Sequence, residues 1–220
     1  MELGQLVSIM WEGILESLYM TVVSTLLAYV IGVPLGVILY VTDKDGIVEN
    51  GPVNKVLGVI VNLLRSVPFI ILLVAILPFT RFIVGTTIGA TATIVPLVVA
   101  ATPFVARMVE SSLKEVDGGV IEAALSMGSN TLQIITKVLL PEAKPSLIVG
   151  STIAITTILG YSAMAGFVGG GGLGSIAINY GYYRYQEDIM FITVILLVII
   201  VQIFQETGMK IASGTDKRRR

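Results

Sequence analysis

The chain has 220 residues, of which 55% are hydrophobic and 13% charged, with a formal net charge of −1 and a mean hydropathy of +0.90. A soluble domain of this size cannot bury so much apolar surface, and the near-zero charge gives no field that attracts nucleic acid. The sequence contains no Cys and no His, which excludes disulfides, haem attachment and the usual zinc sites.

Apolar runs of about twenty residues without strand-like alternation predict membrane-spanning helices. The five predicted spans are Leu18–Val41, Val56–Phe79, Gly85–Val105, Leu147–Val168 and Ile189–Gly208. The expected fold class is therefore an all-α integral membrane protein. In this division residues 1–17 are an extracytoplasmic segment, 18–208 the membrane domain and 209–220 a basic cytoplasmic tail.

The basic residues predict the orientation. Eleven of the fourteen Lys and Arg residues fall in the predicted loops 42–55 and 106–146 and in the tail, whereas Arg81 and Arg184 fall on the opposite side. The positive-inside rule assigns the more basic side to the cytoplasm. The N-terminus is thus expected outside and the C-terminus in the cytoplasm.

Arg65 is the one basic residue inside a predicted span, in the run VNLLRSVPFII. In one interpretation the helix starts near Arg65, whose side chain extends to the cytoplasmic interface. In the other, Arg65 faces a water-filled or substrate-lined cavity. Pro68 suits either a helix start or a kink.

The predicted loop 106–146 is about forty residues long, more than a connection needs. Its segment EAALSMGSNTLQIITKVLLPEA (122–143) carries apolar residues at helical spacing. Ser129 or Asn130 could cap a second helix, which Pro141 would end. We expect a helix–turn–helix hairpin along the cytoplasmic face.

The alternative for this segment is an amphipathic helix that rests on lipid. Helices of that kind favour Lys and Arg on their polar face. Lys137 is the only Lys or Arg residue in 122–143, and this low number argues against a helix resting on lipid.

The segment resembles the EAA motif of type I ABC-transporter permeases, which is Glu-Ala-Ala, three residues, Gly, nine residues, Ile, one residue, Leu-Pro. The matching residues are Glu122, Ala123, Ala124, Gly128, Leu140 and Pro141. Val138 stands where Ile is usual. In that family the motif is a coupling helix that docks into a cleft of a separate ATPase subunit. There the small residues would allow a close approach, and Gly128 would permit a tight bend.

The sequence has no G-x-x-x-x-G-K-[ST] phosphate loop. The resemblance therefore implies a transport subunit, not an enzyme, with no cofactor of its own. ATP and Mg would be used by the partner ATPase.

Longer stretches are similar to the permease subunit of bacterial methionine importers. They are residues 65–89, 94–107, 115–128, 160–174 and 179–190. This resemblance covers nearly the whole chain. It implies a type I ABC importer permease fold and a homodimer in the bacterial cytoplasmic (inner) membrane, with two ABC ATPase subunits. It also implies an external substrate-binding lipoprotein that delivers methionine. Import of another amino acid or small polar solute stays open.

Candidates for lining the translocation pathway are Arg65, Tyr161, Ser162 and Met164, because the last three precede the run Gly169–Gly172. A Met side chain suits contact with a thioether, although ordinary helix packing is an equal alternative. The glycine run lacks a following Lys-Ser/Thr and predicts a turn that ends a helix. Three small-residue pairs would allow close helix contact in a packed dimer. They are Gly32 and Gly36, Gly85 and Gly89, and Gly166 and Gly170.

Two other function classes remain open. A membrane enzyme would need titratable groups at catalytic spacing, and the acids near the motif (Glu110, Glu115, Asp117 and Glu122) show none. A secondary transporter would carry intramembrane acids, for which Glu206 is the one candidate.

Overall fold

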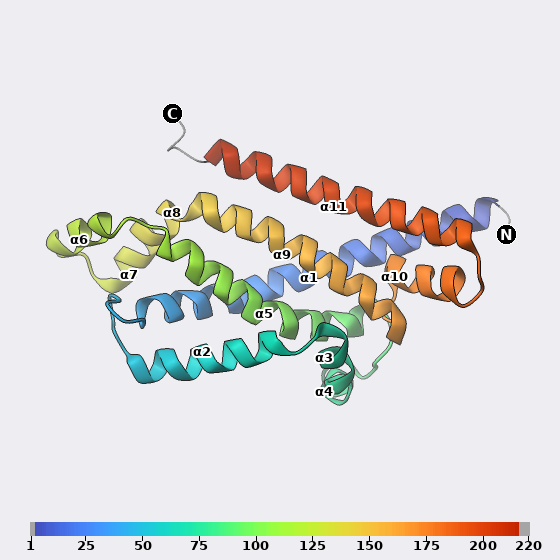
Figure 1. Ribbon diagram of the computed structural model, residues 1–220, viewed down its shortest axis with the longest axis horizontal. Helices are drawn as coiled ribbons and strands as arrows, with labels where there is room; N and C mark the ends of the chain where they lie inside the picture. Colours follow the sequence, from blue (N-terminus) through green and yellow to red (C-terminus); the bar gives the residue numbers. More distant parts are fainter. Residues whose placement is uncertain (1–2, 216–220) are drawn as a thin grey trace. The chain divides into compact units, whose positions relative to one another are not determined.

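The computed structural model describes residues 3–215, and every regular element in that range is a helix (Figure 1). The first part of the chain forms α1 (Leu3–Val41), α2 (Gly51–Ser66), α3 (Phe69–Ala75), α4 (Leu77–Val84) and α5 (Ala90–Lys114). The middle part forms α6 (Gly118–Ser126), α7 (Thr131–Ile134), the π-helical turn η1 (Ile135–Leu139), α8 (Leu140–Glu142) and α9 (Lys144–Met164). The last part forms the 3₁₀ turn η2 (Ala165–Val168), α10 (Gly172–Ile176), the π-helical η3 (Ala177–Tyr182) and α11 (Glu187–Thr215).

Four helical segments of residues 3–215 are long and apolar enough to cross a membrane, and a fifth is present if α2 and α3 count as one broken span. The four are Gly4–Val41, Ala90–Lys114, Lys144–Tyr182 and Glu187–Thr215. The predicted all-helical membrane class is therefore confirmed.

The first, third and fifth spans are longer than predicted, the fifth because α11 runs from Glu187 to Thr215. Helix α1 begins at Leu3 rather than Leu18 and has 39 residues, which at about 1.5 Å per residue is roughly 58 Å. A bilayer core needs about 30 Å. Helix α5 likewise continues past Val105 to Lys114. Hydropathy locates the apolar part of a helix, whereas its polar continuation leaves a weaker signal.

The second predicted span is wrong as a continuous helix. Helix α2 ends at Ser66 and α3 begins at Phe69. Pro68 takes the extended conformation φ −57°, ψ 134°. A proline offers no N–H and disfavours helical conformation in the residue before it, here Val67. Pro68 therefore does not kink a continuous helix. It lies at a break between two helices, directly before the start of α3.

The contacts within the chain define two compact units, which we describe separately. The first contains residues 3–28, 67–101 and 154–205, and the second contains residues 29–66, 102–153 and 206–215.

The core of the first unit is built from α1, α9, α10 and α11. Its buried side chains are Met10, Leu159, Leu173, Ile176, Ile189 and Ile200. Helix α1 also holds the start of α10, because Glu16 Oε2 accepts a hydrogen bond from Gly172 N at 2.6 Å and Ser17 Oγ accepts one from Leu173 N at 2.9 Å. Gly169 ends η2 in the left-handed conformation, so the predicted helix-ending glycine turn is confirmed.

In the second unit, α1 packs closely against α5. A Cβ atom on Gly36 would lie 2.5 Å from the carbonyl oxygen of Ala106, and one on Gly32 would lie 2.8 Å from a Val105 methyl. This small-residue pair therefore serves a close helix contact within the chain. Gly85 and Gly89 were also expected at a helix contact, but they lie between α4 and α5.

Candidate functional site

Helices α6 and α7 form the predicted hairpin, which lies beyond the ends of α5 and α9 in the second unit (Figure 1). Asp117 caps the start of α6, since its Oδ1 accepts a hydrogen bond from Gly119 N at 2.7 Å. At the other end Gly128 N donates to Leu125 O at 2.9 Å, and Ser129 N donates to Ala124 O at 3.1 Å. This pair of bonds is a Schellman motif, whose turn residue must be left-handed. Gly128 has φ 79°, so the bend is built on its lack of a Cβ atom.

The second half of the hairpin starts with a capping box. Asn130 Oδ1 accepts a hydrogen bond from Gln133 N, and Gln133 Oε1 accepts one from Asn130 N, both at 2.9 Å. Asn130 rather than Ser129 is thus the cap.

Pro141 does not end this helical path, contrary to the expectation from sequence. The chain passes through the π-helical turn η1 into α8, which contains Pro141, and then into α9. In a regular α-helix the ring of Pro141 would clash with the carbonyl of Lys137. The wider π turn directly before it provides room for the ring.

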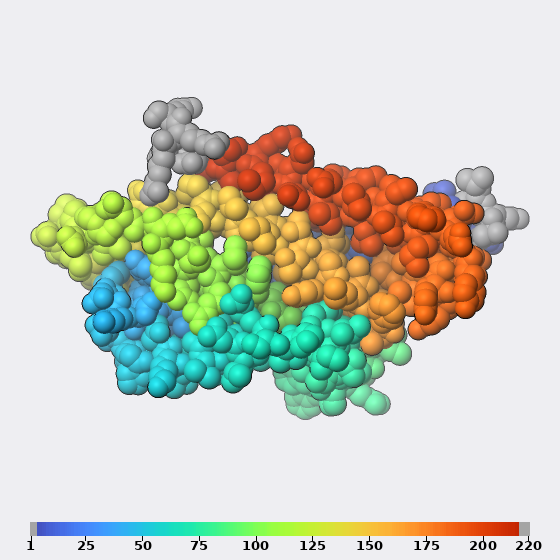
Figure 2. Space-filling model, viewed as in Figure 1, coloured from blue at the N-terminus to red at the C-terminus, as the bar shows by residue number. Residues whose placement is uncertain are grey.

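Apolar side chains are exposed around the tip of the hairpin. Met127 is 79% exposed, Leu132 69% and Leu125 48%, whereas Ala124 is only 3% exposed. Figure 2 shows this yellow-green segment uncovered on the face that is drawn. Glu122, Ala123 and Pro141 are also exposed, and Leu140 is half-buried. The structure therefore places Ala124 inside the hairpin, although the sequence favoured it for contact with a partner.

A chain of charged side chains joins the end of α5 to the turn after α1. Lys114 Nζ lies 2.8 Å from Asp43 Oδ2 and 2.9 Å from Glu110 Oε1. Arg107 Nη1 lies 2.5 Å from Glu110 Oε2. Glu110 is buried, and two basic groups compensate its charge. The hydrogen bond from Lys114 lowers the pKa of the Asp43 carboxyl.

Arg107 extends this network to α2. Its Nη2 atom donates to Gly58 O at 3.1 Å and to Asn62 Oδ1 at 3.0 Å. Neither Arg107 nor Asp43 was predicted from sequence as a functional residue. The spacing of Arg107, Glu110 and Lys114 along one helix could have indicated the first two pairs, but no local pattern indicates the pairing with Asp43.

The pathway candidates from sequence have different surroundings. Tyr161 stacks on Phe69 with 4.5 Å between ring centroids. Ser162 is buried and donates to Leu159 O at 2.8 Å, while Met164 is exposed. Arg65 belongs to the second unit, where it lies exposed in the last turn of α2 with no ion pair among the described residues. A role of these four residues in lining the pathway stays a prediction.

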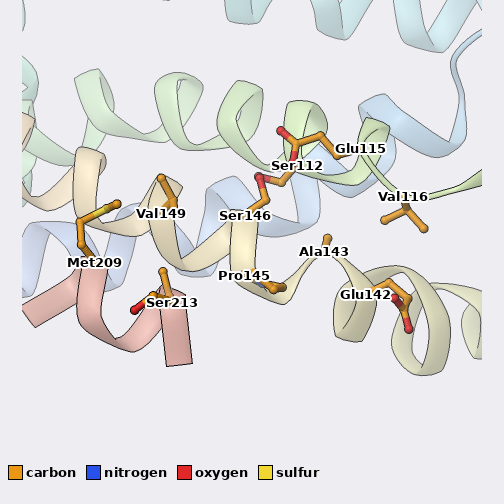
Figure 3. Close-up of a pocket in the computed structure, with 11 residues that line it drawn as sticks. Ser112, Glu115, Val116, Glu142, Ala143, Pro145, Ser146, Val149, Met209 and Ser213 are labelled. Carbon is orange, nitrogen blue, oxygen red and sulfur yellow. The ribbon is translucent and has the colours of Figure 1, made fainter. Parts of the chain in front are cut away.

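A pocket of about 440 Å³ lies at the base of the hairpin, between the end of α5, the start of α9 and the end of α11 (Figure 3). Ser112 and Ser146 point toward each other in it, with 3.0 Å between their hydroxyl oxygens. Its lining comprises Ser112, Glu115, Val116, Glu142, Ala143, Pro145, Ser146, Val149, Met209, Ala212 and Ser213. Two carboxylates and no basic group line it. Among residues 3–215 no cluster of acids could hold a metal ion.

Comparison with known proteins identifies the family. Residues 32–207 match the model of the binding-protein-dependent transport system inner membrane component. The chain belongs to this family. The "Probable D-methionine transport system permease protein MetI" of Vibrio cholerae is 53% identical over 203 residues, which are 92% of this chain and 90% of the relative. The methionine import system permease protein MetP of Bacillus subtilis is 46% identical over 209 residues, 95% of this chain and 94% of the relative.

Two solved structures share the fold. A chain of the MetNI methionine ABC transporter, in an inward-facing conformation, superposes with a TM-score of 0.96 at 48% identity, covering 99% of this chain and 100% of that one. An amino acid ABC transporter crystallised with histidines superposes with a TM-score of 0.68 at 21% identity. The match covers 96% of this chain and 94% of that one, and it shows a likeness of fold alone. The resemblance that the EAA motif indicated is confirmed, and the chain is an inner membrane permease.

Proposed function

We propose that this chain is the permease subunit of an ATP-driven methionine importer of the bacterial inner membrane. The similarity to methionine permeases along nearly the whole length carries the proposal. Fold by itself would not define the substrate, because the amino acid transporter at 21% identity has the same architecture.

Two copies of the chain would form the translocation pathway with two ATPase subunits. The sequence contains no phosphate loop, so the energy must come from a partner. An extracytoplasmic lipoprotein would deliver methionine. ATP and Mg would bind to the ATPase subunits and not to this chain.

The hairpin α6–α7 is the proposed docking site for the ATPase subunit. The support is the exposure of Met127 and Leu132 at its tip, on a turn fixed by Gly128 and by the capping box. Exposed apolar side chains on a rigid turn suit a groove in a partner. The small residues Ala123 and Gly128 leave the backbone of the tip accessible, while Ala124 fills the interior of the hairpin.

Two of the acids that could have indicated another function form ion pairs. Glu206 lies 3.5 Å from Lys210 one turn further along α11, and both are exposed. Glu110 is enclosed between Arg107 and Lys114. These contacts favour a permease over a secondary transporter or a membrane enzyme.

Reconstitution tests the proposal. The chain should be co-expressed with its ATPase subunit and placed with its lipoprotein in proteoliposomes, with ATP inside the compartment that the ATPase faces. We expect ATP-dependent uptake of labelled L- and D-methionine that an excess of another amino acid does not reduce. Uptake of a different amino acid with none of methionine would assign the chain to another substrate. No ATP-dependent uptake at all would contradict the permease function.

A further inference from the structure

Lys114 stands at the joint between the membrane helix α5 and the hairpin. It is the last residue of α5, and only residues 115–117 separate it from α6. Its ammonium group contacts Glu110 one turn back on α5 and Asp43 in the turn after α1. The Lys114–Asp43 contact is thus a direct ionic link between the root of the hairpin and the α1–α2 turn.

The α1–α2 turn is held together by its own hydrogen bonds. Val48 N donates to Val41 O at 2.9 Å, and Asn50 N donates to Thr42 O at 3.1 Å. Asn54 Nδ2, on α2, donates to Leu39 O at 2.6 Å, at the end of α1. A force on Asp43 would therefore displace the C-terminal end of α1 and the start of α2 together.

Glu110 adds a second attachment in the same direction. Its buried carboxylate accepts from both Lys114 and Arg107, and Arg107 continues to Gly58 and Asn62 on α2. Charge-assisted hydrogen bonds are short and directional, so they hold one relative position where an apolar contact could slide.

We propose that Lys114 is a positioning residue, which makes the α1–α2 turn move with the hairpin when the ATPase subunits close. The inference rests on the proposed function, since it requires the hairpin to be the docking site. Methionine transport would then need Lys114 even though this residue touches neither methionine nor ATP. Coupling of this kind requires elements that move as rigid units. The α1–α2 turn is such an element, because its own hydrogen bonds hold it together.

The coupling role is separable from stability. The side chains of Lys114 and Asp43 are 49% and 36% exposed, and exposed ion pairs contribute little to folding. Asp43→Asn removes this pair while Lys114 and Arg107 still compensate Glu110, so it should leave the fold and the assembly intact.

The experiment uses the full transporter with its ATPase subunits and lipoprotein in proteoliposomes, and measures methionine uptake and ATP hydrolysis together. The variants are Lys114→Met and Asp43→Asn. Lys44→Met and Glu49→Gln are matched controls from the same turn, without an ion pair in the described chain. We expect both variants to retain the ATPase and to hydrolyse ATP, while methionine taken up per ATP falls by about five- to tenfold, within the usual range of coupling between sites. Lys114→Arg should restore most of the uptake, and the controls should match the wild type.

Unchanged uptake per ATP in Lys114→Met and Asp43→Asn would overturn the inference. Loss of the ATPase subunits from these two variants but not from the controls would also overturn it, because the pair would then serve assembly. A wild-type chain that neither retains the ATPase nor takes up methionine would instead refute the proposed function, and this inference with it.

Discussion

The ammonium group of Lys114 lies 2.8 Å from the carboxylate of Asp43 and joins the end of α5 to the turn after α1. The hydrogen bond from Lys114 lowers the pKa of Asp43 below its ordinary value of 3.8. Asp43 thus stays ionised in the folded protein at pH values where the unfolded chain takes up a proton.

This difference predicts how the pair responds to acid. Because the pKa is lowered by folding, the stabilisation is complete above pH 3.8 and is lost as the pH falls through the folded value. Asp43→Asn should lower the free energy of unfolding by at most about 1 kcal/mol at pH 7, since the pair is partly exposed. Thermal unfolding in detergent from pH 7 to pH 3 should show the difference from wild type shrink toward the acid end. A difference that stays constant over this range would contradict the assignment.

The exposed tip of the hairpin predicts that a charge placed there weakens binding of the ATPase subunit. Met127 is 79% exposed, and a charge placed there would be desolvated in a partner's groove. Met127→Glu should weaken ATPase binding by tenfold or more, equivalent to about 1.4 kcal/mol or above. Co-purification of the ATPase with the tagged permease measures it. Val48→Glu adds the same charge to an exposed apolar position of the α1–α2 turn and should leave the complex intact. Equal recovery with both variants would exclude Met127 from the interface.

The left-handed conformation of Gly128 predicts that different substitutions reduce ATPase binding and uptake to different extents. Its φ of 79° is strained for residues with a Cβ atom, by about 1–2 kcal/mol, and Asn tolerates it best. No atom lies within 4 Å of the position of a Cβ on Gly128, so crowding within the chain is not the reason for glycine. We expect Gly128→Leu to insert into the membrane but to lose the ATPase and uptake, and Gly128→Asn to keep more of both. Normal assembly and uptake in Gly128→Leu would refute the coupling role and favour a helix lying on lipid.

Ser17 predicts a stability effect in the first unit. Its hydroxyl is buried and accepts the hydrogen bond of Leu173 N at the start of α10. Ser17→Ala leaves that buried N–H without its partner, at a cost of about 1–3 kcal/mol. The melting temperature in detergent should fall, whereas Ser126→Ala, at an exposed serine that bonds within its own helix, should change it little. Equal melting temperatures of the two variants would contradict the capping role of Ser17.

The orientation of the chain is predicted by its basic residues, eleven of which lie on the expected cytoplasmic side and two on the other. A tag before residue 1 should be accessible from outside and a tag after residue 220 only from the cytoplasm. Protease protection in oriented vesicles measures this. Five spans place the two ends on opposite sides and four place them on the same side, so the result also decides whether α2 and α3 together cross the membrane.

The sequence alone determined the features that depend on neighbours a few residues apart. The long apolar runs predicted a helical membrane protein, Ser129 or Asn130 predicted a helix start, and Gly128 predicted a bend. The EAA spacing predicted the family, since the motif is read in one stretch of chain. Hydrogen bonds in helices and turns join residues three to five apart, and their rules are therefore visible in sequence.

Only the tertiary structure decided which distant residues meet. Glu16 and Gly172 are 156 positions apart and share a hydrogen bond. Lys114 at the end of α5 pairs with Asp43, which lies before α2 in the chain. Such partners depend on the packing of α1, α5 and α10 within their units, where glycines such as Gly36 allow close contact. Packing within the hairpin likewise buries Ala124, which the motif left indistinguishable from the exposed Ala123. Contacts between residues distant in sequence depend on how the helices pack and which side chains become buried. No short stretch of sequence reveals them.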